Sequence, residues 1–227
     1  MNRRDFLKGL GMSFLAAANP ITLSEASANG IRFYHNEDIP LSDLVQSTKD
    51  KDNGNQEKKI VIHKNQHLME VYLGNHLLKE YEVSISQKPI GDKIKEGDKK
   101  TPTGTFYVAR KNPNSSFHKA LVLGYPTMKH AKEGLFYDLI DQETYQRIEE
   151  SAKRCKEPPR NTGLGNLIEI HGGDKPGSPD WTWGCVAISN KAMDEVYSFA
   201  EVGCTADFDS DNYLDSSKYK TAVIIKR

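Results

Sequence analysis

Hydrophobic and polar residues alternate in several short runs along the first half of the chain. The runs K-I-V-I-H-K, H-L-M-E-V-Y-L and L-L-K-E-Y-E-V-S-I-S are rich in β-branched and aromatic residues, and the turn-prone pairs Asn65-Gln66 and Gly74-Asn75 separate them. Met69, Val71 and Leu73 would share one face of a strand. This alternation predicts an antiparallel sheet with one buried face and one face in solvent.

Further strands are expected at residues 105–109, 121–123, 168–171 and 185–188, and the closing run T-A-V-I-I-K-R is typical of a core strand. Helical spacing is found loosely at residues 139–148 and more clearly after Ser189 or Asn190, either of which can cap a helix. The pattern as a whole predicts a mainly β fold with peripheral helices.

The first 28 residues follow the order of an export signal. The start M-N-R-R-D-F-L-K matches the twin-arginine signal with Arg3-Arg4, an apolar run covers 9–18, and Ala26-Ser27-Ala28 suits signal peptidase. The alternative is an amphipathic helix that belongs to the fold. The apolar run is too short for a permanent anchor, and no later segment is apolar enough to span a bilayer. We therefore expect an exported protein that begins near Asn29 and lacks a membrane span after processing.

Residues 29–57 are expected to form an N-terminal arm and a polar linker. Scattered apolar residues in 30–45 could pack as a short arm. From Gln46 to Lys59 the chain reads Q-S-T-K-D-K-D-N-G-N-Q-E-K-K, which is polar, aperiodic and typical of a solvated spacer. One domain is then expected over 58–227, with a helical insertion at about 130–166 that could cover a cleft.

Charge and length exclude some classes of function. The 31 Lys and Arg residues balance the 31 Asp and Glu residues, so the formal net charge is zero. A nucleic-acid-binding protein would show an excess of basic residues, so no nucleic-acid partner is expected. The length suits one domain plus a leader, and the oligomeric state stays open.

The three cysteines are too few for a disulfide scaffold. Cys155 and Cys204 either form one bridge or remain two unpaired thiols. They lack the short ligand pairs of a zinc site, and the acidic stretch 207–215 lacks the central Gly and terminal Glu of a calcium loop. No metal site is predicted.

The stretch I-E-I-H-G-G-D-K-P-G-S-P-D-W-T-W-G-C-V-A-I-S, residues 168–189, holds the candidate chemistry. If its two apolar runs are strands, the isoleucines and Val186 point into the core while His171 and Cys185 point away from it. A neighbouring imidazole usually lowers the pKa of a thiol and activates it as a nucleophile. Gly184, without a Cβ, would let a substrate carbonyl approach the backbone. The alternative is structural, because a lone Cys or His is often a packed core residue.

The same stretch resembles the signature of the L,D-transpeptidase catalytic domain (YkuD-like) family, a His-Gly followed after a spacer by Ser/Thr-x-Gly-Cys and an aliphatic residue. Here these positions are His171-Gly172 and 182–186. The family's G-D-x-x-T-P-x-G segment is matched by Gly97-Asp98 and 101–104. The resemblance implies a YkuD-like β-sandwich or mixed sheet.

It also implies roles for the residues. Cys185 would attack a substrate carbonyl, and His171 would hold the thiolate and then protonate the leaving amine. The Gly172 carbonyl would fix the tautomer of His171, and the N–H groups of Gly184 and Cys185 would receive the oxyanion. No metal or organic cofactor is implied.

The implied substrate is the stem peptide of peptidoglycan, cleaved between the L-centre of diaminopimelate and D-alanine. The acyl group would pass to the amine of another stem, which forms a 3-3 crosslink, or to a lysine of a wall-anchored protein. The implied location is the periplasm or cell wall.

One departure from the family keeps alternatives open. Many members carry Arg two residues after the Cys, whereas this chain has Ala187 and resembles the branch with G-C-[IV]-A. Hydrolysis by an L,D-carboxypeptidase or amidase is therefore an alternative to transfer, and a non-catalytic wall-binding module is a third. The candidate substrate contacts, with His118 as a weaker one, are Trp181, Thr182, Trp183 and Tyr125. For each of the two tryptophans, packing in the core is the alternative.

Overall fold

The computed structural model of the chain describes residues 39–51, 54, 56–173, 180–205 and 215–227, and all of them belong to one compact unit, 33–227. The expected leader at 1–28 lies outside the described residues, as does nearly all of the acidic stretch 207–215. In the part of the chain that is described, no helix has the length and apolarity needed to cross a membrane.

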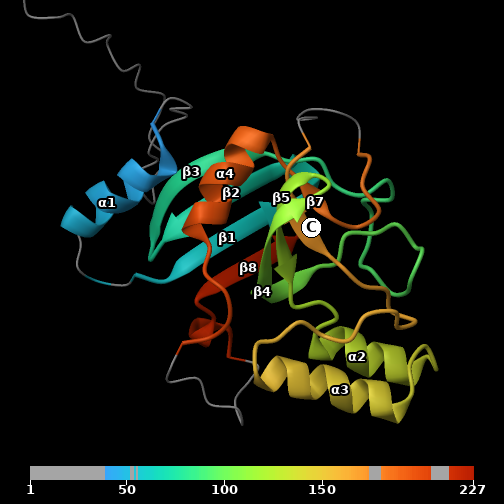
Figure 1. Cartoon of the computed structure of the whole chain (residues 1–227). Helices are drawn as coiled ribbons and strands as arrows, with labels where there is room; N and C mark the ends of the chain where they lie inside the picture. The colour runs from blue at the N-terminus through green and yellow to red at the C-terminus, as the bar shows by residue number, and fades with distance from the viewer. Residues whose placement is uncertain (1–38, 52–53, 55, 174–179, 206–214) are drawn as a thin grey trace, which may run out of the picture. The chain divides into compact units, whose positions relative to one another are not determined.

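Eight strands form a single mixed sheet in the order β3-β2-β1-β8-β4-β5-β6-β7 (Figure 1). The strands are β1 Lys58–His63, β2 Leu68–Leu73, β3 His76–Glu82, β4 Gly104–Ser115, β5 His118–Leu123, β6 Glu169–His171, β7 Val186–Ala187 and β8 Thr221–Lys226. Strand β1 is parallel to β8 and β6 is parallel to β7, whereas the other neighbours are antiparallel. The predicted mainly β fold with a mixed sheet is confirmed.

The sheet curls because the chain after β3 reaches the strand at the other end of the order. Ser84 exchanges two backbone hydrogen bonds with Ala187 of β7, at 2.9 and 2.8 Å. Ser86 bridges Thr182, two residues before Gly184. The first meander of the chain therefore supports the loop that carries Cys185.

Alternation along the strands separates core from surface as predicted. Met69, Val71 and Leu73 of β2 are buried, while the residues between them are only half-buried. Helix α4, Asn190–Phe199, packs Met193 and Val196 into the same core. The side chain of Ser189 accepts a hydrogen bond from the Ala192 N–H, so the predicted N-cap is confirmed.

The expectation of an unstructured spacer from Gln46 onward is wrong for its first six residues. Helix α1 covers Leu41–Lys51. Leu41 is buried in the main core, and Leu44 and Val45 pack against it. Burial of this one face stabilises a helix whose second half would not fold by its own composition. Lysines in the last turn also interact favourably with the negative end of the helix dipole.

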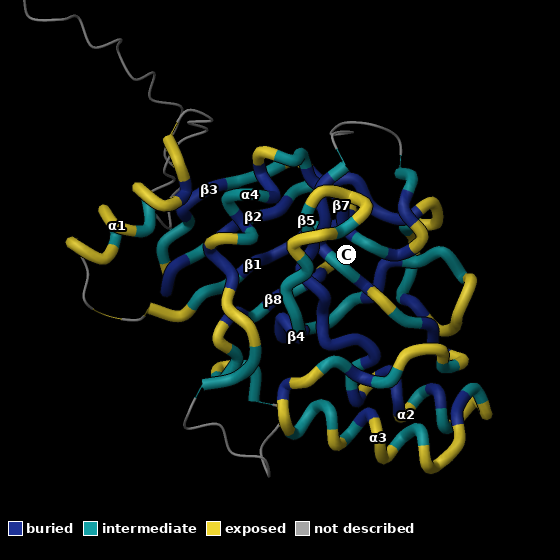
Figure 2. The backbone as a smooth tube through the Cα atoms, in the orientation of Figure 1, coloured by how far each residue is buried: buried dark blue, intermediate teal, exposed yellow. Residues whose placement is uncertain are grey.

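The insertion contains two helices where the spacing suggested one. Helices α2, Met128–Phe136, and α3, Gln142–Lys153, pack side by side around a small core of their own that includes Ile148 and Leu164 (Figure 1). Their outer faces are exposed (Figure 2). Cys155, just after α3, forms a disulfide with Cys204, which decides between the two alternatives left open by the sequence.

Candidate active site

Strands β6 and β7 bring the two candidate catalytic residues onto one face. Ile170 pairs with Val186 and His171 pairs with Ala187 in a parallel register, and the Ile170 and Val186 side chains lie in the core. His171 therefore faces away from the core, and so does Cys185, which comes one residue before Val186. The predicted division of the two faces is confirmed.

The His171 ring is enclosed by aromatic side chains. Its centroid lies 4.6 Å from that of Phe117, nearly parallel, and 5.6 Å from that of Trp181, edge on. Nδ1 lies 2.5 Å from the carbonyl oxygen of Gly172. Because a carbonyl only accepts, Nδ1 carries the hydrogen and Nε2 is left as an acceptor. Burial lowers the pKa of His171, although the Gly172 carbonyl opposes this shift, so the imidazole is neutral at rest.

The Cys185 thiol is protonated at rest. Its sulfur donates to the Leu167 carbonyl oxygen at 3.3 Å and makes no hydrogen bond to His171. Burial raises the pKa of the thiol, and the Glu169 carboxylate adds to this rise, while the Glu169 N–H and Lys93 partly oppose it. The expectation that the imidazole lowers the pKa of this thiol is thus wrong for the resting structure, because enclosure of the sulfur outweighs the nearby positive groups.

The turn before Cys185 is shaped by Thr182 and Gly184. The Thr182 hydroxyl donates to the Cys185 carbonyl at 2.7 Å and accepts from the Gly184 N–H at 3.3 Å. Gly184 has φ +141°, and a Cβ there would lie 3.0 Å from both Ile168 Cδ1 and the Lys100 carbonyl oxygen. Glycine is therefore required by backbone conformation and packing, a reason that the sequence did not suggest. In the described part of the chain the Cys185 N–H has no acceptor.

The candidate substrate contacts differ in accessibility. Trp183 is 72% exposed, and the Lys99 ammonium lies 5.1 Å from its ring centroid. Trp181 lies in the aromatic cluster around His171. Thr182 is buried within the turn. Tyr125 is buried, and its hydroxyl donates to the Leu164 carbonyl at 2.9 Å.

Fold and site together match a known family. The family model of the L,D-transpeptidase catalytic domain (YkuD) matches residues 57–224. The chain belongs to this family. No curated protein sequence matches it.

Several solved structures resemble this L,D-transpeptidase-family chain. The helical cell shape determining protein Pgp2 from Campylobacter jejuni is 18% identical, with a TM-score of 0.46 and coverage of 82% of this chain and 55% of that chain. Bd1075 from Bdellovibrio bacteriovorus is 17% identical, with a TM-score of 0.46 and coverage of 78% of this chain and 50% of that chain. The L,D-transpeptidase from Xylanimonas cellulosilytica is 12% identical, with a TM-score of 0.39 and coverage of 80% of this chain and 68% of that chain. The chain thus spans about half the length of Pgp2 and Bd1075.

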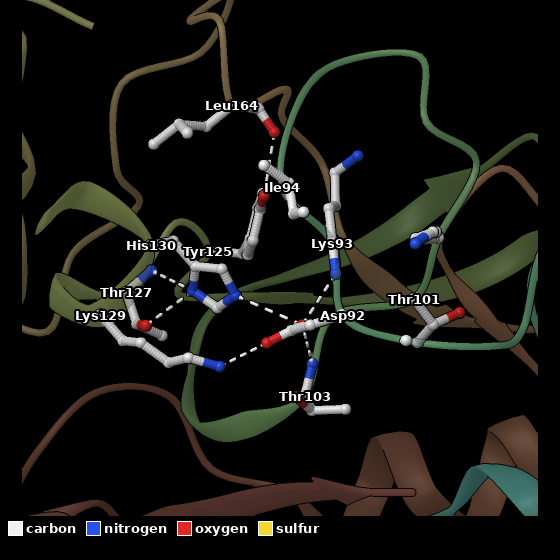
Figure 3. A network of polar contacts seen from close by, with 12 residues as sticks. Asp92, Lys93, Ile94, Thr101, Thr103, Tyr125, Thr127, Lys129, His130 and Leu164 are labelled. Carbon is white, nitrogen blue, oxygen red and sulfur yellow. Dashed lines mark hydrogen bonds and ion pairs between the residues drawn. The ribbon is translucent and has the colours of Figure 1, made fainter. Parts of the chain in front are cut away.

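In this L,D-transpeptidase domain a loop at 88–103 borders the turn that carries Cys185, because the Lys100 carbonyl lies against Gly184. Asp92 fixes one end of this loop (Figure 3). Asp92 accepts from the Thr103 N–H at 2.7 Å and from the Lys129 ammonium. His130 Nε2 lies 3.8 Å from Asp92 Oδ1. Burial would raise the pKa of Asp92, but the nearby His130 ring and the hydrogen bonds from Lys129 and Thr103 more than offset it and lower the pKa. Asp92 therefore connects the loop to α2.

Asp98 and Lys64 hold the rest of the loop. Asp98 accepts from the Lys93 ammonium at 2.8 Å and from three backbone N–H groups. The buried Lys64 ammonium donates to the carbonyls of Gly91 and Thr101, both at 2.8 Å. The family segment at 97–104 is therefore a hydrogen-bonded support for the site.

The turn between β4 and β5 also belongs to the site, although the sequence did not single out Phe117. A Cβ on Gly172 would lie 2.8 Å from the Phe117 carbonyl oxygen, so this turn packs directly on the His-Gly pair. His118, the weaker candidate contact, binds Asp194 of α4 at 2.7 Å. Phe117 is 54 positions from His171, and no local pattern in the sequence indicates that they meet.

The described residues contain no group of three or more His, Cys, Asp or Glu side chains that could hold a metal ion.

Proposed function

We propose that this protein is a peptidoglycan L,D-transpeptidase that acts through a thioester on Cys185. The observation that carries the proposal is the position of His171 and Cys185 on one face of neighbouring strands, within the motif of the family. The proposed reaction uses no metal or organic cofactor.

The first step is formation of the thioester. The Cys185 thiol turns from the Leu167 carbonyl toward His171 and gives its proton to Nε2, which the Gly172 carbonyl keeps available. The thiolate attacks the carbonyl of the L-centre of diaminopimelate in the stem peptide. His171 then protonates the leaving D-alanine amine as the C–N bond breaks.

The oxyanion is the second requirement. The Cys185 N–H is available to it, and the Gly184 N–H can exchange its long bond to Thr182 for the developing charge. Loss of one such donor typically costs about 3 kcal/mol of transition-state stabilisation. Trp181 and Trp183 are the proposed substrate contacts, and Thr182 shapes the turn.

The acyl group then passes to an amine. The acceptor is another stem peptide, which gives a 3-3 crosslink, or a lysine of a wall-anchored protein. The proposed branch of the family is the one with G-C-[IV]-A, because Ala187 stands two residues after Cys185, and other residues would then recognise the substrate carboxylate. We also propose twin-arginine export to the periplasm or cell wall, with cleavage after Ala28, and a catalytic domain over 58–227. The Cys155–Cys204 disulfide supports this location, because such bonds persist in oxidising compartments.

Two measurements test the function. A carbapenem should add its mass to Cys185, the one free cysteine, and the Cys185→Ala variant should show no adduct. Purified protein with tetrapeptide stems should then yield crosslinked dimers by mass spectrometry. Tripeptide products without dimers would indicate L,D-carboxypeptidase activity and contradict transfer. Binding to wall material without any adduct would indicate a non-catalytic module.

A further inference from the structure

A row of side chains crosses four neighbouring strands and ends at Cys185. Arg110 of β4 pairs with Val122 of β5, and Val122 pairs with Glu169 of β6. Since Ile170 pairs with Val186, Glu169 stands opposite Cys185 on the adjacent strand. Paired residues point to the same face, and neighbouring strands are about 4.8 Å apart. The Glu169 side chain therefore lies directly beside that of Cys185.

The Glu169 side chain is half-buried. In the described part of the chain its carboxylate has no hydrogen bond and no ion pair. The two nearby guanidinium groups are engaged elsewhere, because Arg110 Nε binds Glu157 at 2.9 Å and Arg160 Nε binds Glu157 at 2.7 Å. Burial raises the pKa of Glu169, and Arg110 and Arg160 oppose this rise. A half-buried carboxylate without a partner is unfavourable, and beside a nucleophile it indicates a binding function.

We propose that the Glu169 carboxylate binds the ammonium group of the acyl acceptor. This inference rests on the proposed function of Cys185. The attacking nitrogen must come within about 3–3.5 Å of the thioester carbonyl carbon, and therefore close to the sulfur. A carboxylate one strand away from Cys185 is near that nitrogen. The ammonium group on the far centre of a diaminopimelate donor is several bonds away from the reacting carbonyl, so it fits this position less well.

During acyl transfer the acceptor nitrogen loses two protons. The acceptor ammonium binds Glu169 and gives it one proton, so the carboxylate becomes a carboxylic acid and the amine becomes neutral. The amine nitrogen attacks the thioester carbonyl, the C–N bond forms and the C–S bond breaks. The thiolate leaves, and the second proton of the nitrogen passes through His171 to the Cys185 sulfur. Water needs no such partner, so Glu169 favours transfer over hydrolysis.

The test uses the full-length protein with Glu169→Gln, which keeps the shape and removes the charge. Acylation of Cys185 by a carbapenem and by a tetrapeptide donor is measured first, and it should be at least as fast as in wild type, because loss of the Glu169 charge removes one contribution that raises the pKa of the thiol. The KM for a primary amine acceptor should rise by at least about tenfold, and the ratio of amide to hydrolysis product should fall accordingly. Hydroxylamine, which is uncharged at neutral pH, should accept the acyl group equally well in both proteins. Glu143→Gln, at an exposed position of α3, is the matched control and should change none of these values.

The outcomes separate the two proposals. Normal acylation with an unchanged acceptor KM in Glu169→Gln would overturn the role of Glu169 and leave the function of Cys185 intact. Equal losses with the charged amine and with hydroxylamine would also overturn it, because a merely structural role acts on both acceptors. Wild-type protein that is not acylated at all would instead overturn the proposed function.

Discussion

At the scale of single residues, the candidate nucleophile and base form a neutral pair. Cys185 donates to a backbone carbonyl, and His171 is held by the Gly172 carbonyl with Nε2 as an acceptor. Burial shifts the two pKa values apart, because it disfavours the charged form of each group. Both groups are therefore uncharged in this arrangement, and proton transfer from Cys185 to His171 must precede nucleophilic attack.

Alkylation of Cys185 by iodoacetamide tests this arrangement. The thiolate is the reactive form, so the rate should rise about tenfold per pH unit and should continue to rise above pH 9. A model cysteine peptide, with a pKa of about 8.5, should level off near that pH. Cys155 and Cys204 form a disulfide and do not compete. A plateau below pH 8 would mean that the thiol is activated at rest.

At the scale of elements, two carboxylates hold the loop at 88–103 by hydrogen bonds and ion pairs. Asp92 binds α2 and the residue before β4, and Asp98 binds the Lys93 ammonium together with three backbone N–H groups. Burial would raise the pKa of Asp98, but the hydrogen bonds from Lys93, Ile94 and Lys95 lower it. The loop that borders Cys185 is thus stabilised by charge.

Asp98→Asn should reduce the free energy of unfolding by about 1–3 kcal/mol at pH 7, because the charged acceptor of several donors is lost. The folded pKa of Asp98 lies below the unfolded value, so its contribution is present at neutral pH and is lost as pH falls below about 4 through the folded pKa. The difference between variant and wild type in urea unfolding should therefore shrink from pH 7 toward pH 2. Asp138→Asn, at an exposed position, is the control and should change little. A pH-independent difference would contradict this account.

At the scale of the whole molecule, the disulfide connects segments that the sheet alone leaves apart. Cys155 follows α3 of the insertion, and Cys204 follows α4 and lies near β8. The two cysteines are 49 residues apart in sequence. Tyr107 adds a hydrogen bond from its hydroxyl to the Lys156 carbonyl at 2.7 Å. The insertion is therefore fastened to β4 and to the segments next to β8.

Replacement of Cys155 and Cys204 by Ser should lower the free energy of unfolding by about 2–4 kcal/mol, since the crosslink restricts the unfolded chain. A reducing agent should lower the urea midpoint of the wild type and leave that of the double variant unchanged. Carbapenem acylation of Cys185 should persist in the variant at 25 °C. No change in the midpoint of the wild type on reduction would contradict a stabilising disulfide.

The sequence by itself determined the β alternation, the cap of α4 and the family motif, because each depends on residues close together along the chain. The alternation of side chains along a strand placed His171 and Cys185 on one face, and this argument also depends only on neighbouring residues. Only the tertiary structure decided that the thiol points to Leu167, that Phe117 stacks on His171 and that Glu169 stands opposite Cys185 on the neighbouring strand. These features join segments that are far apart in sequence or depend on burial. Helix α1 and the disulfide belong to this second group. Packing against the finished core stabilises the helix and positions the two cysteines, and local composition does neither.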